Sequence, residues 1–353
     1  YAHHPPLTNM AQVFVYGLAG EGEAQLRLFG YFAGFFTLWA LIILLRKLTI
    51  SWAAALLAVG ALASTTFFWA FGRLGGGFSM SVGFLAAVAH LRNQDQPSRR
   101  AIVAASVLGA ASVLLSWPGA AAAALGGVWL LMGRGWDRST KVVAAVGVAT
   151  AAALAVWILS ATDIGELADQ ARSRSNTDNF TWAEFLDKQW SYASRLLPSW
   201  YVWLLAPSLV GGLWHGRTRP IIAITGSVAL AWTLGPQEGA FNHEFWNLNW
   251  FLPLTVGLAA LIDLISGWFQ RLHSRGALIP LAIASLLLVT ALWGRVGATA
   301  FRGGADAGEL LERNEPPAGQ NTVWVASNIA APRWAAWYWD LSVSVLPATN
   351  AAL

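Results

Sequence analysis

Long runs of apolar residues, separated by short polar stretches, make up most of this chain. A transmembrane helix needs about 20 mostly apolar residues. Several of the runs are shorter than this, but a helix inside a bundle can be shorter than one that faces lipid on all sides. The pattern predicts an all-α integral membrane protein, a polytopic bundle of about ten transmembrane helices. The predicted spans are residues 27–45, 51–70, 74–91, 101–116, 118–132, 142–160, 197–214, 221–234, 246–269 and 277–293.

Composition supports the membrane class. Of the 353 residues, 56% are hydrophobic and 11% are charged, and the mean hydropathy is +0.51. A soluble domain carries about 25% charged residues, so this chain has too few to cover a surface that faces water. The net charge of +4 does not indicate nucleic acid, because the basic residues lie in short loops beside apolar runs. Cysteine is absent, which excludes disulfides and thiol chemistry.

Two interpretations exist for the apolar stretch interrupted by Trp117-Pro118-Gly119: a helical hairpin, or one long kinked helix. The charge of the loops favours the hairpin. With ten spans, every short loop on one side carries lysine or arginine, and that side is predicted to be cytoplasmic. A single kinked helix would move the last three basic clusters to the other side. The basic clusters predicted on the cytoplasmic side are Arg46 with Lys47; Arg92, Arg99 and Arg100; Arg134, Arg138 and Lys141; Arg217 and Arg219; and Arg271 and Arg275.

Polar residues also lie on the opposite, outer face, where they are not needed to orient the protein in the membrane. They include an outer loop, residues 161–196, that is too long to be a mere connection. Its first half repeats apolar residues at helical spacing from Ile164, and Thr181 to Glu184 forms a capping-box pattern that starts a second helix. We interpret both as amphipathic helices in the outer interface; the alternative is a disordered acidic loop.

The chain is predicted to have two parts. Residues 1–293 form the transmembrane domain, and residues 294–353 form a small outer C-terminal segment, either a cap or the start of a truncated domain. At the other end, His3 and His4 precede two prolines, which lack backbone donors and hold the histidines on an extended segment. These histidines are either solvated loop residues or ligands for a phosphate or a metal ion.

Three short motifs resemble one family. His-His-Pro-Pro-Leu at residues 3–7, Gly-Glu-Gly-Glu-Ala-Gln-Leu-Arg-Leu at residues 20–28, and Asn-His-Glu-Phe-Trp at residues 242–246 before Leu252-Pro253-Leu254 occur in the order found there. They resemble the lipid-linked-sugar glycosyltransferases of the GT-C class, in the branch of protein O-mannosyltransferases and aminoarabinose transferases. The resemblance covers most of residues 1–293.

The resemblance implies transfer of a hexose or pentose from a polyprenyl-phosphate-linked sugar to a protein, lipid or glycan acceptor. It implies a multi-pass protein of the plasma (inner) membrane, surrounded by membrane lipids, with its active site facing the periplasm or exterior. No nucleotide cofactor is expected. The family's first helix and its acidic catalytic base would precede Tyr1, so we expect this chain to be N-terminally truncated and to lack the base.

Such a reaction needs cations or a divalent metal ion at the leaving phosphate, because negative charge grows there as the glycosidic bond breaks. Predicted substrate- or phosphate-binding residues are His3, His4, Arg73, His243, Glu244 and Lys188. A metal site would use His3, His243 and Glu244, with a position left open for phosphate. The alternatives are helix caps for His243 and Glu244, and a solvated charge for Lys188. Further candidates are Arg195 as a cation, with a solvated charge as the alternative, Asp178 and Glu238 as acceptor-side carboxylates, and Trp190, Trp246 and Trp250 as stacking surfaces. Arg27 is expected to anchor its helix start by pairing with Glu21 or Glu23, with phosphate binding as the alternative.

Two other functions fit the same pattern. A transporter or flippase for lipid-linked sugars is disfavoured, because the predicted spans carry few of the buried charges that mark a transport path. A non-catalytic assembly subunit of the cell envelope is the third hypothesis. An acidic residue upstream, on an outer loop before the His-Pro motif, would favour the enzyme over both.

Overall fold

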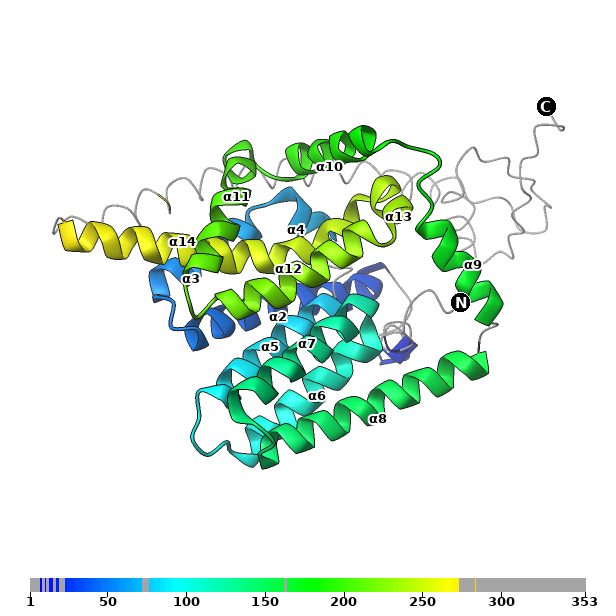
Figure 1. The fold of residues 1–353 in the computed structure, drawn as a ribbon, viewed down its shortest axis with the longest axis horizontal. Coiled ribbons are helices and arrows are strands. Elements are labelled where there is room, and N and C mark those ends of the chain that lie inside the picture. Colours follow the sequence, from blue (N-terminus) through cyan, green and yellow to red (C-terminus); the bar gives the residue numbers. More distant parts are fainter. Residues whose placement is uncertain are drawn as a thin grey trace. The chain divides into compact units, whose positions relative to one another are not determined.

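The computed structural model describes residues 23–71, 76–161 and 164–272, together with residues 7, 10, 13, 14, 17, 18 and 283. The chain divides into two units, Tyr1–Gly294 and Arg295–Leu353, and all of the second lies outside the described residues. In the described part every regular element is a helix (Figure 1). The helices are α2 (Glu23–Lys47), α3 (Trp52–Ala63), α4 (Thr66–Phe71), α5 (Gly76–Arg92), α6 (Arg99–Leu115), α7 (Trp117–Arg134), α8 (Arg138–Ala161), α9 (Ile164–Arg174), α10 (Trp182–Leu196), α11 (Ser199–Trp214), α12 (Arg219–Leu234), α13 (Gln237–Asn242), the 3-10 helix η2 (Glu244–Trp250) and α14 (Phe251–Leu272).

The all-α membrane class is confirmed. The lengths of the helices do not confirm the predicted number of about ten spans. Three described helices are long and apolar enough to cross a membrane, in Gly30–Lys47, Arg138–Ser160 and Trp246–Trp268. The pair α10 and α11 adds a fourth if it is counted as one bent span. Two further apolar helices, α3 and α12, are shorter. The predicted span at residues 277–293 lies outside the described residues.

The predicted span 51–70 is wrong as a single helix, because it breaks between α3 and α4. Two hydroxyl side chains satisfy the backbone groups at the break. Ser64 Oγ donates to the Ala61 carbonyl (2.8 Å), and Thr65 Oγ1 donates to the Leu62 carbonyl (2.8 Å) and accepts from the Phe68 N–H (3.1 Å). Side-chain bonds of this kind compete with helical ones, so the apolar run alone did not reveal the break.

The hairpin predicted around Pro118 is confirmed. Ser116 is extended (φ −162°, ψ 150°), and its Oγ caps α7 by accepting from the Gly119 N–H at 3.0 Å. The two helices run antiparallel, with Gly109 of α6 and Gly126 of α7 on either side of Phe84 from α5. A Cβ at these glycines would lie 3.0 and 2.7 Å from the Phe84 ring. Glycine therefore makes room for the aromatic side chain at the centre of this half of the bundle.

The second half of the bundle is built on a close contact between α11 and α14. A Cβ on Gly257 would lie 2.3 Å from the Ser208 carbonyl oxygen, and one on Gly212 would lie 2.9 Å from Gly257 Cα. Small residues let helix backbones approach in this way, and the approach provides van der Waals contact in a lipid environment. Because α11 follows α10 and α14 follows η2, the contact also positions the elements of the candidate site.

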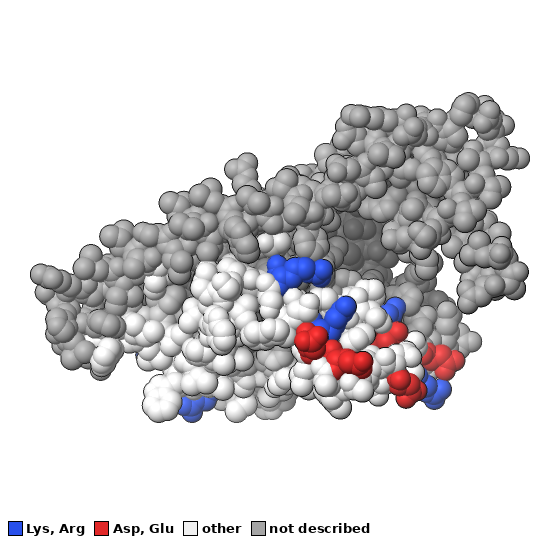
Figure 2. All heavy atoms as spheres, turned by 90° about the horizontal axis from the view of Figure 1, so that it is seen from above, with Lys and Arg blue, Asp and Glu red and all other residues white. Residues whose placement is uncertain are grey.

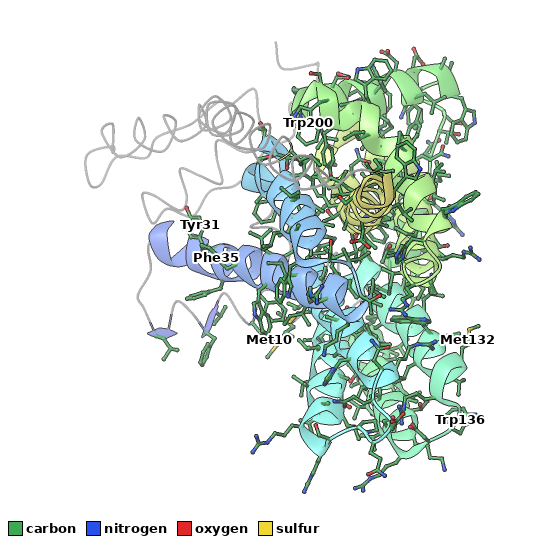
Figure 3. The ribbon with its side chains drawn as sticks, turned by 90° about the vertical axis from the view of Figure 1, so that its left-hand side faces the viewer. Met10, Tyr31, Phe35, Met132, Trp136 and Trp200 are labelled. Atoms are coloured by element: carbon green, nitrogen blue, oxygen red, sulfur yellow. The ribbon has the colours of Figure 1, made fainter. Side chains whose placement is uncertain are left out.

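The surface of α8 is the clearest sign of lipid contact. Its span, Arg138–Ser160, is apolar, yet only 11% of it is buried inside the molecule. A soluble protein does not leave a face of this size to water. Trp136 lies at one end of the bundle and Trp200 at the other (Figure 3), consistent with the aromatic side chains found at both membrane interfaces.

Hydrogen bonds join several of the predicted basic loops at one end of the bundle. Asn93 Nδ2 donates to the Lys47 carbonyl at 2.6 Å, and Arg217 Nη1 donates to Thr49 Oγ1. These bonds link loops that are far apart in sequence. We refer to this end as the basic end.

Arg134 is central to the basic end and is 13% exposed. Its guanidinium donates to the carbonyls of Leu91 (3.0 Å), Gln94 and Asp95 (3.2 Å) and to Asp137 Oδ2 (2.6 Å). Burial alone would raise the pKa of the Asp137 carboxyl. Hydrogen bonds from Ser139, Thr140 and Arg134 outweigh it and hold that pKa well below its usual range.

Candidate functional site

The candidate site lies around α10 and α13, which belong to the predicted outer half of the chain. Helix α10 begins with the predicted capping box: Thr181 Oγ1 accepts from the Glu184 N–H (3.3 Å), and Glu184 Oε2 accepts from the Thr181 N–H (2.6 Å). Hydrogen bonds from the Thr181 backbone and side chain lower the pKa of the Glu184 carboxyl. A bend of 116° then separates α10 from α11. Helix α10 therefore runs in a different direction from α11, as expected if α10 is an amphipathic helix that lies in the interface.

Helix α10 presents two different faces. Phe185 and Tyr192 are buried, and Gln189 lies between them on the same face. On the other face Trp182, Leu186 and Trp190 recur every four residues and are 59%, 61% and 53% exposed. This is the distribution expected of a helix at a lipid interface. The predicted start of this helix is therefore confirmed, whereas its place in the outer interface stays a prediction.

Side chains of α10 bind the end of α13. Gln189 Nε2 donates to the Ala240 carbonyl (2.9 Å), and Tyr192 OH donates to the Phe241 carbonyl (2.7 Å). The last carbonyls of a helix have no partner within it, so these bonds satisfy two of them. Asn247 of η2 completes the junction by donating to Gln189 Oε1 at 2.9 Å. Burial raises the pKa of the Tyr192 hydroxyl, although Arg195 opposes the shift.

Aromatic rings and cations cover this junction. Phe180 stacks on Phe241 with ring centroids 4.3 Å apart and planes 8° apart. Lys188 Nζ lies 5.5 Å from the Tyr192 ring centroid and 5.8 Å from that of Phe241. The Arg195 guanidinium lies 5.8 Å from the Tyr192 centroid. Aromatic faces attract cations, so two positive charges are held above one aromatic surface, with Lys188 exposed.

Charged side chains gather on α9 and α10. Viewed from above the bundle, Lys, Arg, Asp and Glu cluster on one part of the described surface, and most of the rest carries no charge (Figure 2). The exposed charged residues of the two helices include Asp169, Arg172, Glu184, Asp187, Lys188 and Arg195. Arg172 pairs with Asp169 of its own helix at 3.1 Å. Both members of this pair are highly exposed, so the pair adds little to stability.

His243 lies where α13 ends and η2 begins. Burial lowers the pKa of its imidazole, and Arg174 lowers it further, whereas Glu238 opposes the change. Arg174 and Glu238 themselves form a long ion pair of 4.0 Å. With its pKa below the ordinary value of about 6.5, His243 is mostly neutral at pH 7. A neutral imidazole can accept a hydrogen bond or bind a metal ion.

The two charged neighbours of His243 are expected to shift its pKa in opposite directions. Arg174→Gln removes a nearby positive charge, so the pKa of His243 should rise. Glu238→Gln removes the negative charge, so the pKa should fall further. NMR titration of the His243 ring protons in detergent measures both changes, with the exposed Arg172→Gln as a control expected to change little. Shifts of the same sign in the two variants would contradict this electrostatic account.

The predicted stacking surfaces have distinct surroundings. Trp246 stacks on Trp232 of α12, with centroids 5.0 Å apart and planes 14° apart. Trp250 Nε1 donates to Thr233 Oγ1 at 3.0 Å. Trp190 contacts Trp203 of α11 edge to face, at 6.4 Å. Trp246 and Trp250 thus join η2 to α12, and Trp190 belongs to the exposed face of α10.

Comparison with known proteins bears on the fold. No protein-family profile matches the sequence, and no curated protein has significant sequence similarity to it. Two solved structures of ArnT from Cupriavidus metallidurans do match. The structure bound to undecaprenyl phosphate aligns with 96% of this chain and 75% of that chain, at a TM-score of 0.58 and 15% identity. The apo structure aligns with 96% and 74%, at 0.54 and 13%.

The chain has the ArnT fold. The fold that the sequence resemblance implied is therefore confirmed, and so is the membrane class. At 13–15% identity the likeness to ArnT concerns the arrangement of the helices.

The structure describes only some of the predicted site residues. Lys188 and His243 lie at the junction of α10, α13 and η2. Glu244 begins η2, but its side chain is outside the described part, and His3, His4 and Arg73 are outside it entirely. In the described ranges no three His, Asp or Glu side chains are placed to hold a metal ion. The predicted metal site, which needs His3, stays a prediction.

Three residues of the junction were not singled out from the sequence: Arg174, Tyr192 and Asn247. Each acts through a partner far along the chain, such as Tyr192 through the Phe241 carbonyl, 49 residues away. No local pattern marks such pairs.

Proposed function

We propose that this chain is a membrane glycosyltransferase that moves a sugar from a polyprenyl-phosphate donor to an acceptor. The observation that carries the proposal is the ArnT fold over 96% of the chain, since one of the two ArnT structures holds undecaprenyl phosphate. ArnT is an aminoarabinose transferase of the GT-C class. The motifs at residues 3–7, 20–28 and 242–246 support the same class independently of the fold.

The junction of α10 and α13 has the groups that the donor's phosphate requires. As the sugar–phosphate bond breaks, negative charge grows on the phosphate, and positioned cations stabilise it. Lys188 and Arg195 hold positive charge above the aromatic surface. We propose that this charge, with His4 and Arg73, binds the phosphate, while the polyprenyl chain lies in the membrane.

The acceptor hydroxyl needs a general base, which we place upstream of Tyr1, as the resemblance implies. The active site is proposed to face the periplasm or exterior, opposite the basic end. A divalent metal held by His3, His243 and Glu244 would supply further positive charge to the phosphate. Chelation by EDTA followed by readdition of Mg²⁺ or Mn²⁺ distinguishes a metal-dependent reaction from one that uses the cationic side chains alone.

Sugar transfer by the complete protein tests the proposal. The protein is reconstituted in vesicles with a polyprenyl phosphate that carries a radiolabelled sugar, and cell-envelope fractions are supplied as acceptors. Transfer of label to a protein, lipid or glycan is expected. His4→Ala and Arg73→Ala should each reduce the rate at least about tenfold, the effect of about 1.4 kcal/mol on the barrier. Arg172→Ala, on the same half but paired within α9, is the matched control and should leave the rate unchanged.

The outcomes separate class from site. Unchanged rates in both variants would remove the proposed phosphate site and leave the transferase class standing. Movement of the labelled lipid across the vesicle membrane, with no transfer of sugar, would replace the transferase by the transporter hypothesis. Absence of both activities would favour the assembly subunit.

A further inference from the structure

The arginines at the basic end fall into two groups. One group is engaged by hydrogen bonds within the chain: each member donates to a described backbone or side-chain oxygen, although Arg217 and Arg219 are themselves exposed. Its members are Arg46 (Ile50 carbonyl), Arg92 (Trp129 carbonyl), Arg134, Arg217 (Thr49) and Arg219 (Leu213 carbonyl). Arg46 and Arg92 also lie over the rings of Trp52 and Trp129. This group is explained by the fold.

The second group is exposed, and in the described part of the chain the side chains of its members have no hydrogen bond or ion pair to another residue. It consists of Arg99, Arg100, Arg138 and Lys141, which we call the basic patch. All four lie in the first turns of α6 and α8, two helices that begin at the same end and pack side by side. Figure 3 shows nitrogen-tipped side chains projecting from the end of the bundle where Trp136 is labelled.

Nearby carboxylates leave most of this charge uncompensated. Asp137 already accepts hydrogen bonds from Arg134, from Ser139 and from the Thr140 N–H, so its charge is neutralised within the loop. Asp95 is the other carboxylate in the adjoining loops. The start of α6 is capped by a neutral serine, Ser98. Two arginines in the first turn of a helix oppose its dipole, so an anion at this point would be favoured.

An apolar surface adjoins the basic patch. Met132, in the last turn of α7, and Trp136, just before α8, are 80% and 64% exposed, and the α8 span is only 11% buried. A ligand at the patch would therefore meet positive charge and a lipid-facing helix together. A free anion would use only the first of these, whereas a phospholipid would use both.

We propose that the basic patch binds the anionic headgroup of a phospholipid, whose acyl chains lie along α8. The engaged arginines fold the end of the bundle, and the four free cations recruit the lipid. This site is at the end opposite the one proposed for sugar transfer, and it does not depend on that activity.

Native mass spectrometry of the full chain in neutral detergent tests the proposal. Phosphatidylglycerol is compared with phosphatidylcholine of the same acyl chains, and the former should bind preferentially. A variant with all four patch residues changed to Gln should lose affinity for phosphatidylglycerol about 30-fold, equivalent to two cations at about 1 kcal/mol each. Affinity for phosphatidylcholine should not change. Glycerol 3-phosphate, which has the phosphate but no acyl chains, should bind at least about tenfold more weakly than the lipid.

The matched control keeps the charge and changes the side chains: Arg99→Lys, Arg100→Lys, Arg138→Lys and Lys141→Arg together. It should retain the preference for phosphatidylglycerol. If the four-Gln variant does not fold, the pairs R99Q/R100Q and R138Q/K141Q are measured separately, with about fivefold loss expected in each. Equal binding of the two lipids by the wild-type chain, undiminished binding by the Gln variants, or equal binding of glycerol 3-phosphate would overturn the proposal.

Discussion

Replacing Gly257 with alanine is expected to destabilise the protein by about 1–3 kcal/mol, the usual cost of overpacking a closely packed interior. The new Cβ would lie 2.3 Å from the Ser208 carbonyl oxygen and 2.7 Å from the Ser208 carbonyl carbon. Both are backbone atoms, which cannot move aside as the end of a flexible side chain can. Relief therefore requires α11 and α14 to separate, which forfeits contacts along their interface.

The measurement is the unfolding free energy in mixed micelles, followed by the loss of helical signal. Gly267→Ala is the matched control, because Gly267 is in the same helix and a Cβ at that position would meet nothing within 4 Å. That substitution should be neutral or should stabilise by up to about 1 kcal/mol, since alanine is the better helix former. Equal effects of the two substitutions would contradict the close contact between α11 and α14.

Arg134→Gln is expected to destabilise the protein by about 2–3 kcal/mol. The change removes the donors that satisfy three carbonyls at the end of α5 and in the loop after it, and it removes the partner of Asp137. Buried polar groups left without partners cost about 1–3 kcal/mol, and a broken, largely buried ion pair costs more. Arg138→Gln is the control, because Arg138 is exposed at the start of α8, four residues away, and its substitution should change stability by less than about 0.5 kcal/mol.

The effect of Arg134→Gln should depend on pH with a definite sign. The pKa of the Asp137 carboxyl is lower in the folded protein than in the unfolded chain. This difference stabilises the protein at pH values above the usual carboxyl pKa, and the stabilisation is lost as the pH falls. Between about pH 5 and pH 3 the wild-type protein should therefore lose more stability than Arg134→Gln does. The difference in unfolding free energy between the two proteins should become smaller as the pH falls. Unfolding at a series of pH values measures this. A difference that stayed constant over the range would show that Asp137 is not the group responsible.

Features set by neighbouring residues were predictable from the sequence. The hairpin at Ser116 follows from Pro118 together with the alternation of loop charge, and the start of α10 follows from Thr181 and Glu184. The capping residues are local signals, and the loop charge is an asymmetry between the two sides of the membrane. The class of fold also followed, because 56% hydrophobic residues arranged in long runs admit few soluble alternatives.

Features set by tertiary contact were not predictable. The break between α3 and α4 depends on how Ser64 and Thr65 bond to the backbone, which the apolar run 51–70 does not reveal. The pairing of Gln189 and Tyr192 with α13 joins segments about 50 residues apart. Nor could the loop sequences separate the engaged Arg134 from the free Arg138, because both are arginines beside the same turn.

A structure of the protein with undecaprenyl phosphate bound would show where the donor's phosphate lies. We expect the phosphate at the junction of α10, α13 and η2, within reach of Lys188 or His243, with its polyprenyl chain against the apolar surface of the bundle. Undecaprenyl phosphate bound with its phosphate at the opposite end, beside Arg134, or no binding of this lipid at all, would contradict that expectation.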